Sequence, residues 1–241
     1  MMSSDEAPHL RQLFIDLRDQ EFSDRQLGWL IQFTDTFDAS SLEEFWFNVS
    51  VPMENDYVDV ERIGDPIVIA IVDRLRQCER LQSLHLTLDG SYVGAEGIHA
   101  IVDWVRQRKI PIDLHLGLRH VHLDDDDARA LGQLVACLDT HPLSTLSLDL
   151  YQCRLDDDSM QAMAEEATNN TNNNVTKGLL TMDLSCNEDL CNIAPLAKLF
   201  RCAEYVSLDV RGSLTSTQMQ TLRDRCCDGE RRILRTGTNG K

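Results

Sequence analysis

Two histidines and an aspartate occupy matching places in neighbouring segments of this chain, and they are the residues best suited to chemistry. His85 and His115 each lie at the centre of an alternating apolar segment, and Asp113 lies two residues before His115. Imidazole and carboxylate groups can bind metals or transfer protons. A metal needs three or four ligands at about 2.0 to 2.2 Å, and the open, shallow face expected here supplies little pocket. We therefore predict a polar binding surface with no metal ion and no cofactor.

Two acidic runs could also be mistaken for a cation site. Asp124–Asp127 and Asp156–Asp158 each stand where a helical pattern begins. A carboxylate there accepts hydrogen bonds from the free backbone N–H groups of the first turn, so helix capping accounts for both runs. Neither run has the glycine and glutamate of an EF-hand loop. The sequence lacks GxGxxG, GxxxxGK[ST], HExxH and GxSxG, so we predict no catalytic residue and no enzyme of a standard type.

The cysteines and the N-terminal residues bear on the compartment. Cys78 and Cys137 fall in helical patterns, Cys186 falls at an inward strand position, and no CxxC pair suits zinc. This placement is typical of small buried thiols in a reducing environment. The first residues, MMSSDEAPHLRQ, are polar and acidic, and no segment approaches the roughly 18 apolar residues of a membrane span. We expect an intracellular protein of the cytoplasm or nucleus, with an organelle left open, and no membrane insertion.

The elements that must position these side chains are strands, because one alternating pattern recurs seven times. Each recurrence places three apolar residues at every second position, which is typical of a strand with one buried face. Successive recurrences begin about 24 to 39 residues apart, in the range of solenoid repeats. The seven triplets are Leu13/Ile15/Leu17, Phe45/Phe47/Val49, Leu84/Leu86/Leu88, Leu114/Leu116/Leu118, Leu146/Leu148/Leu150, Met182/Leu184/Cys186 and Val206/Leu208/Val210.

Helical patterns lie between the strand patterns. A unit of one strand and one helix cannot bury its apolar face alone, so each unit must stack on its neighbours. The sequence therefore predicts an α/β solenoid of about seven repeats, with parallel strands on its concave face and helices on its convex face. The apolar stripes of the predicted helices are Leu27/Leu30/Ile31, Ile67/Ala70/Ile71/Leu75, Ile98/Ile101/Val102/Val105, Leu131/Leu134/Val135/Leu138, Met160/Met163/Ala164/Ala167, a short Pro195/Leu196/Leu199/Phe200 and Met219/Leu222.

Four stretches resemble leucine-rich repeats: LHLTLDGSYVGAEG, LHLGLRHVHLDDDD, LSLDLYQCRLDDDS and LLTMDLSCNEDL. Their units of 30 to 32 residues are similar to the ribonuclease-inhibitor subtype, and Cys153 and Asn187 match its Cys/Asn position after the strand. The equivalent places elsewhere hold Gln20, Pro52, Ser91 and Val121. The resemblance implies a horseshoe fold, which hosts many binding roles. It covers most of the chain, and we divide the sequence into an N-terminal segment (1–9), a leucine-rich-repeat domain (10–228) and a basic C-terminal tail (229–241).

The charge of the chain limits its partners. The sequence carries 40 Asp and Glu residues against 23 Lys and Arg residues, a net charge of −17. Such an excess repels phosphate backbones and anionic lipid over a Debye length of about 8 to 10 Å, so we predict no nucleic-acid partner. A protein with a basic or mixed surface is the expected partner.

The outward residues of the strands form three lateral rows on the concave face. Adjacent strands are about 4.8 Å apart, so neighbours in one row touch. The central row is predicted as Phe14, Trp46, His85, His115, Ser147, Asp183 and Ser207. The rows beside it are predicted as Asp16, Asn48, Thr87, Gly117, Asp149, Ser185 and Asp209, and as Gln12, Glu44, Ser83, Asp113, Thr145, Thr181 and Tyr205.

Exposed aromatic residues on this face are the predicted anchors for a partner. Phe14 and Trp46 lie side by side on a face that should be wet, and interface hot spots favour aromatics ringed by polar groups. A structural role in covering the N-terminal end of the solenoid is the alternative. A rim loop at Val51–Gly64 could add contacts. The full predicted partner-binding set is Phe14, Trp46, His85, His115, Asp113, Asp149, Asp183, Tyr205 and Asp209.

These observations predict a non-catalytic scaffold that binds a macromolecular partner through its concave face and rim loops. Two other functions stay open. The first is a regulator of an enzyme, which includes an inhibitor of a basic enzyme, an activator of a small GTPase and a substrate receptor of a ubiquitin ligase. The second is a structural subunit of a large complex, which the uncapped first strand favours because its backbone edge needs cover.

Overall fold

The computed structural model describes residues 10–18, 28, 32, 40–50, 64–140, 143–169, 178–226 and 232–235. Within them, eight strands form one all-parallel sheet in the order of the chain, and a helix precedes each strand from β3 onward. The strands are β1 (Gln12–Asp16), β2 (Glu44–Asn48), β3 (Ser83–Thr87), β4 (Ile112–Gly117), β5 (Leu143–Asp149), β6 (Leu179–Asp183), β7 (Tyr205–Asp209) and β8 (Arg232–Arg235). The described helices are α2 (Asp65–Leu75), α3 (Ala95–Gln107), α4 (Asp125–Thr140), α5 (Asp157–Asn169), α6 (Ile193–Leu199) and α7 (Ser216–Cys226).

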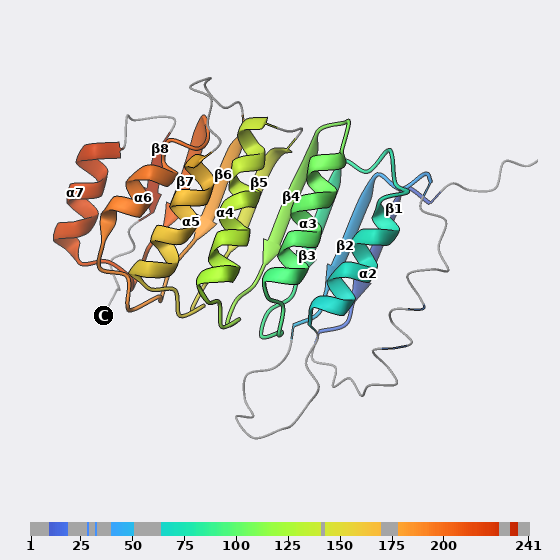
Figure 1. Ribbon diagram of the computed structural model, residues 1–241, viewed down its shortest axis with the longest axis horizontal. Coiled ribbons are helices and arrows are strands. Elements are labelled where there is room, and N and C mark those ends of the chain that lie inside the picture. The colour runs from blue at the N-terminus through green and yellow to red at the C-terminus, as the bar shows by residue number, and fades with distance from the viewer. Residues whose placement is uncertain are drawn as a thin grey trace, which may run out of the picture.

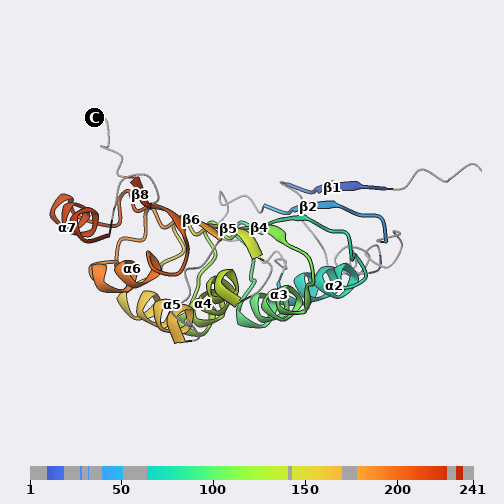
Figure 2. The same cartoon turned by 90° about the horizontal axis from the view of Figure 1, so that it is seen from above.

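The strands and the helices form two layers. Figure 1 shows the helices lying side by side in front of the sheet, in the same order as the strands. Seen from above, the strand layer is bowed, and the helices all lie on its outer, convex side (Figure 2). The free face of the sheet is therefore concave. The predicted α/β architecture with an all-parallel sheet is confirmed, while the first predicted helical stripe, Leu27/Leu30/Ile31, lies outside the described residues.

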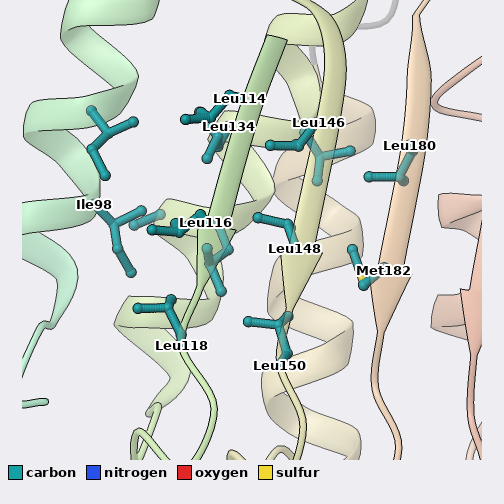
Figure 3. Close-up of a cluster of buried hydrophobic side chains, with 14 of the residues drawn as sticks. Ile98, Leu114, Leu116, Leu118, Leu134, Leu146, Leu148, Leu150, Leu180 and Met182 are labelled. Atoms are coloured by element: carbon teal, nitrogen blue, oxygen red, sulfur yellow. The ribbon is translucent and has the colours of Figure 1, made fainter. Parts of the chain in front are cut away.

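Alternation of apolar residues along the strands builds the core between the layers. The inward residues of β2 to β7 are all buried, and those of β4 and β5 lie in register beside one another, facing the helices (Figure 3). Leu116 and Leu148 are neighbours in this register. Burial of one such side chain contributes about 1.5 to 3 kcal/mol relative to its exposure. Stacking of the units thus stabilises the fold in the way that the sequence predicts.

Strand β1 is less well buried than the strands that follow it. Its inward residues Leu13, Ile15 and Leu17 pack against the core but remain only half-buried. Their register neighbours on β2, Phe45 and Phe47, are 1% and 2% exposed. The N-terminal edge of the sheet is therefore its least protected part among the described strands.

The turn after each strand repeats one backbone conformation. Each strand from β3 to β7 is followed by a last inward leucine or valine, such as Leu118 after β4. The residue two positions after it has a positive φ, between 55° and 73°, in five successive units. In the first four of these units its backbone N–H donates to the next unit, as from His120 to Tyr151 O at 3.0 Å and from Cys186 to Arg211 O at 2.8 Å. The five residues are Gly90, His120, Gln152, Cys186 and Gly212. The sequence-based placement of Cys186 at an inward strand position is therefore wrong, because β6 has already ended at Asp183.

The residue after the positive-φ position joins neighbouring C-terminal units through side-chain hydrogen bonds. Asn187 is fully buried, and its amide donates to Leu150 O at 3.0 Å and to Leu184 O at 2.9 Å. The backbone N–H of Leu155 donates to Asn187 Oδ1 at 3.1 Å. Cys153 and Ser213 occupy the same place in their own units, and they donate to Leu118 O and Leu184 O. Each bond satisfies a buried backbone group that the curved stack leaves without a partner.

An eighth strand lies in the segment that the sequence assigns to a basic tail. Residues 232–235 pair in parallel with β7, and the register places Leu234 beside Leu208. Leu234 is 8% exposed and joins the core, whereas Ile233 points to the free face and is 50% exposed. The four-residue pattern is too short to show alternation by itself. The open backbone edge of β7 supplies the hydrogen bonds that the sequence alone could not reveal.

Candidate functional site

Four ring-bearing side chains lie in one row across β1 to β4 on the concave face. The parallel register places Phe14 beside Trp46, Trp46 beside His85, and His85 beside His115. The centroids of the Phe14 and Trp46 rings are 5.5 Å apart, and those of His85 and His115 are also 5.5 Å apart. The indole of Trp46 stacks on His85, with centroids 3.6 Å apart and an interplanar angle of 12°. We call Phe14, Trp46, His85 and His115 the aromatic row.

The first half of the aromatic row is open to solvent. Phe14 is 58% exposed and Trp46 is 39% exposed. Both residues belong to strands whose opposite side faces the core, so the alternation of the strand puts them on the free face. Exposed rings of this size, set among polar residues, are characteristic of the centre of protein interfaces.

The two histidines are held by serine hydroxyls. His85 Nε2 lies 3.0 Å from Ser83 Oγ on the same strand, and His115 Nδ1 lies 3.0 Å from Ser147 Oγ on β5. Partial burial lowers the pKa of His85, and the neighbouring His115 lowers it further, against the opposing effect of Glu44 and Asp113. Burial also lowers the pKa of His115, with Asp149 opposing and Arg119 reinforcing the change. Both imidazoles are therefore biased toward their neutral form.

Asp113 lies in the row beside the histidines. Its register neighbours are Ser83 on β3 and Thr145 on β5, and its side chain is exposed. One ring nitrogen of each histidine, Nε2 of His85 and Nδ1 of His115, contacts a serine hydroxyl. Among the described residues, no three His, Cys, Asp or Glu side chains are placed to hold a metal ion. The geometry of the described part of this face is that of a polar surface with rings.

The structure corrects the predicted rows at β6. This strand covers Leu179–Asp183, so its inward residues are Leu180 and Met182, two residues earlier than the sequence-based assignment. The central row passes through Thr181 in place of Asp183, and Asp183 moves into the next row. The apolar alternation continues through Leu184 to Cys186, so two registers fit the pattern equally well. Hydrogen bonding to β5 and β7 decides between them.

The corrected register brings three carboxylates side by side. Asp149, Asp183 and Asp209 are consecutive neighbours on β5, β6 and β7. We call them the carboxylate row. Arg119 Nε donates to Asp149 Oδ2 at 2.5 Å, and Arg211 Nη2 lies 2.7 Å from Asp209 Oδ2. The two outer carboxylates, Asp149 and Asp209, are thus each paired with an arginine.

The middle carboxylate, Asp183, is held differently. Its Oδ1 accepts hydrogen bonds from the backbone N–H of Ser185 at 2.9 Å and from the Ser185 hydroxyl at 2.5 Å. No ion pair to Asp183 occurs within the described residues. Asp183 thus has no direct ion pair in the described part of the chain, although its charge helps to raise the pKa of both Arg119 and Arg211.

Arg119 also ties the carboxylate row to the preceding unit. Its backbone N–H donates to Asp89 Oδ1 at 2.9 Å. Burial raises the pKa of Asp89, although this hydrogen bond acts in the opposite direction. Neither arginine is predicted from the sequence, although Arg18, Arg119 and Arg211 each stand two residues after the end of a strand. Arg18 pairs with Asp16 in the same way.

A second exposed apolar group lies at the C-terminal end of the face. Tyr205 is 43% exposed, and its register neighbour Leu179 is 37% exposed. Ile233 on β8 is 50% exposed beside Ser207. The sequence analysis selected Tyr205 but missed Leu179 and Ile233, because Leu179 depends on the register of β6 and Ile233 on the existence of β8.

The acidic runs cap helices. Asp124 Oδ1 accepts from the backbone N–H groups of Asp126 and Asp127 at 2.9 and 3.0 Å. Asp156 Oδ1 accepts from the backbone N–H of Ser159 at 2.9 Å. The capping prediction is confirmed for both runs. The predicted rim loop lies outside the described residues apart from Gly64, as do residues 1–9.

No family model matches this chain, and no curated protein resembles it at a significant level. Within the described residues, none of the helices has the length and apolar character that crossing a bilayer requires. Cys137 and Cys153 are free thiols buried in the core. Residue geometry on the concave face therefore carries the functional argument.

Proposed function

We propose that this protein is a leucine-rich-repeat protein of the ribonuclease-inhibitor-like subtype. Its function is a scaffold that binds a macromolecular partner through its concave face and does not itself catalyse a reaction. The post-strand hydrogen bonds of Cys153 and Asn187 support the repeat assignment, because they join successive turns at the position where that family carries Cys or Asn. The helices on the convex side and the sequential parallel strands support it as well.

The observation that carries the binding role is the aromatic row. Phe14 and Trp46 expose large rings on the free face of the sheet, beside polar neighbours such as Glu44 and Asn48. Burying such rings against a partner yields about 25 cal/mol per Å² of apolar surface, and the two rings are neighbours, 5.5 Å apart, that one partner surface can cover together. We therefore place the anchor of the interface at the N-terminal strands.

The carboxylate row indicates the charge of the partner. The chain is strongly acidic, and Asp183 offers a carboxylate without an ion pair among the described residues. Four strand spacings separate Trp46 on β2 from Asp183 on β6, a span of about 19 Å. A partner that presents an apolar group and, about 19 Å away, a lysine or arginine complements this face. A basic or mixed protein surface meets both requirements, within an intracellular reducing compartment that suits the free cysteines.

Affinity capture with matched variants tests this function. The full chain is compared with a concave double variant, Phe14→Ser with Trp46→Ser, and with a convex control, His99→Ser with Asp103→Ser, on exposed positions of α3. Proteins that need the concave face should be recovered by the full chain and the convex control, and at least tenfold less by the concave variant. Equal recovery by all three baits would reject the concave face as the binding surface.

The identity of the recovered proteins separates the remaining functions. One small basic enzyme would indicate an inhibitor, and a small GTPase would indicate an activator. A ubiquitin-ligase subunit would indicate a substrate receptor. A stoichiometric set of many proteins would indicate a structural subunit, in which the edge of β1 is covered by a neighbour.

A further inference from the structure

A cavity of about 340 Å³ lies at the ends of α2 and α3, away from the rows of the concave face. Its lining comes from the last turns of α3 and from the residues that follow α2 and α3, and includes Arg76, Glu79, Trp104, Arg108 and Lys109. Cavities that hold small molecules begin at about 300 Å³ and carry a few polar groups that converge on the ligand. The volume and lining of this cavity meet both conditions.

Two residues that line this cavity each carry a buried N–H donor without an acceptor among the described residues. Trp104 is 1% exposed, and its indole Nε1 has no hydrogen-bond partner among the described residues. The same holds for Nε of Arg108. An unsatisfied buried donor costs about 1 to 3 kcal/mol, so two of them at one place are unusual in a folded protein. An acceptor bound in the cavity would remove this cost.

The charge of the lining is opposite to that of the whole chain. Arg76, Arg108 and Lys109 supply three cations, and Glu79 supplies one carboxylate. The chain as a whole carries −17. Arg76 pairs with Asp73 at 3.0 Å, whereas no ion pair involves Lys109 within the described residues. A basic pocket on so acidic a protein favours an anion over a neutral or cationic ligand.

Arg108 is fixed in place before any ligand binds. Its Nη1 donates to Cys78 O at 2.6 Å and its Nη2 donates to Leu81 O, the two carbonyls lying in the turn after α2. Its guanidinium carbon lies 5.2 Å from the centroid of the Trp104 ring. These contacts use one N–H of each Nη, and Nε has no hydrogen-bond partner among the described residues. A site whose donors are already positioned binds with less loss of side-chain entropy.

We propose that this cavity binds a small oxyanion, a carboxylate or phosphate group, that accepts hydrogen bonds from Trp104 Nε1 and Arg108 Nε and pairs with Lys109. Solvent does not reach either nitrogen, so the anion shifts the lining side chains slightly as it enters. The site is separate from the concave face and does not depend on its function.

Nuclear magnetic resonance of the full chain tests the site directly. The sequence has three tryptophans, so a ¹⁵N-labelled sample gives at most three indole N–H signals, and Trp104→Phe assigns the one of interest. Sodium phosphate and sodium acetate are titrated separately against sodium chloride at matched ionic strength. The Trp104 indole signal should shift and saturate with an oxyanion and not with chloride, while the Trp46 signal stays in place.

Two variants separate specific binding from a general charge effect. Lys109→Glu changes an exposed residue of the lining and should raise the half-saturating anion concentration at least tenfold. Lys198→Glu makes the same charge change on α6, away from this cavity, and should leave it unchanged within twofold. Saturation with phosphate alone, or with acetate alone, identifies the anion. No saturable shift with either anion, or an equal response in Lys109→Glu, overturns the proposal.

Discussion

The two halves of the concave face share one backbone design but differ in the chemistry they present. Strands β1 to β4 carry the aromatic row, whose rings touch along the register from Phe14 to His115. Strands β5 to β7 carry the carboxylate row, whose outer members pair with arginines from the turns. The first half offers stacked rings, and the second offers charge beside the exposed side chains of Leu179 and Tyr205. A partner that touches both halves must therefore match two chemistries at a set spacing.

The two halves also differ in the buried side chains that follow their strands. In the C-terminal units, Cys153, Asn187 and Ser213 join neighbouring turns through buried hydrogen bonds. The same place holds Val121 one unit earlier, where a purely apolar side chain is buried at 2% exposure. Ser91 only accepts a long bond from the N–H of Val93, at 3.4 Å. The difference shows that the same buried place after a strand can be filled by a hydrogen-bonding side chain or by an apolar one.

The largest effect is expected for Asn187→Ala, which removes the central member of the buried hydrogen-bond series. Leu150 O and Leu155 N–H lose the Asn187 partner in a fully buried place, and Leu184 O keeps only its bond from the Ser213 hydroxyl. We expect the free energy of unfolding to fall by about 3 to 5 kcal/mol in urea denaturation.

Asn192→Ala is the matched control for this loss. Asn192 is an exposed residue whose side chain caps α6 by accepting from the N–H of Ala194 at 3.0 Å. Loss of an exposed cap costs about 1 kcal/mol. If the two variants lose equal stability, the buried series does not hold the C-terminal units together.

The next effect concerns the aromatic row and separates binding from stability. Trp46→Ala removes the contacts with Phe14 and His85, each worth about 0.5 to 1.5 kcal/mol, so the loss of stability should stay below about 3 kcal/mol. As an interface anchor, the same change should weaken partner binding about 30-fold or more, measured by titration calorimetry with the partner recovered by capture. Trp46→Phe keeps a ring and should lose less of both. A large loss of stability with unchanged affinity would assign Trp46 a structural role.

We expect acid to destabilise the N-terminal half of the protein, because of His85 and His115. Burial lowers the pKa of both imidazoles. The unfolded chain, with an imidazole pKa of about 6.5, therefore binds more protons than the folded protein as the pH falls through that value. The free energy of unfolding should thus fall between pH 7.5 and pH 5.5. A double variant, His85→Gln with His115→Gln, should show a smaller decline over this window, and an unchanged decline would assign the effect to carboxylates elsewhere.

The smallest effect is expected at the centre of the carboxylate row. Asp183→Asn removes one of three adjacent negative charges and keeps an oxygen that can accept from Ser185. The relief of repulsion from Asp149 and Asp209 is opposed by the lost attraction to Arg119 and Arg211. Stability should therefore rise by no more than about 0.5 kcal/mol at 20 mM NaCl, and the change should vanish at 500 mM NaCl because salt screens both interactions. Affinity for a basic partner should fall at low salt. A gain that persists at high salt would have another cause than charge.

Most of the concave face could be predicted from the sequence, up to β5. Strict alternation identifies which residues of each strand face the core, because side chains of a strand alternate between its two faces. The rows from Phe14 through His115 to Ser147 follow from that rule and agree with the register. At β6 the rule fails, since Leu180, Met182, Leu184 and Cys186 alternate without a break. The correct window depends on which backbone groups pair with β5.

The sequence by itself determined the repeating unit, the buried side of each strand and the helices that cover it, because these depend on patterns within a few residues. The tertiary structure alone decided which residues meet across strands: that Trp46 stacks on His85, and that Asp183 lies between two paired carboxylates. It alone also showed that residues 232–235 extend the sheet and that Trp104 and Arg108 share a cavity. Such contacts join residues far apart in the chain, and their distances follow from hydrogen-bond register and helix packing, which local alternation does not specify.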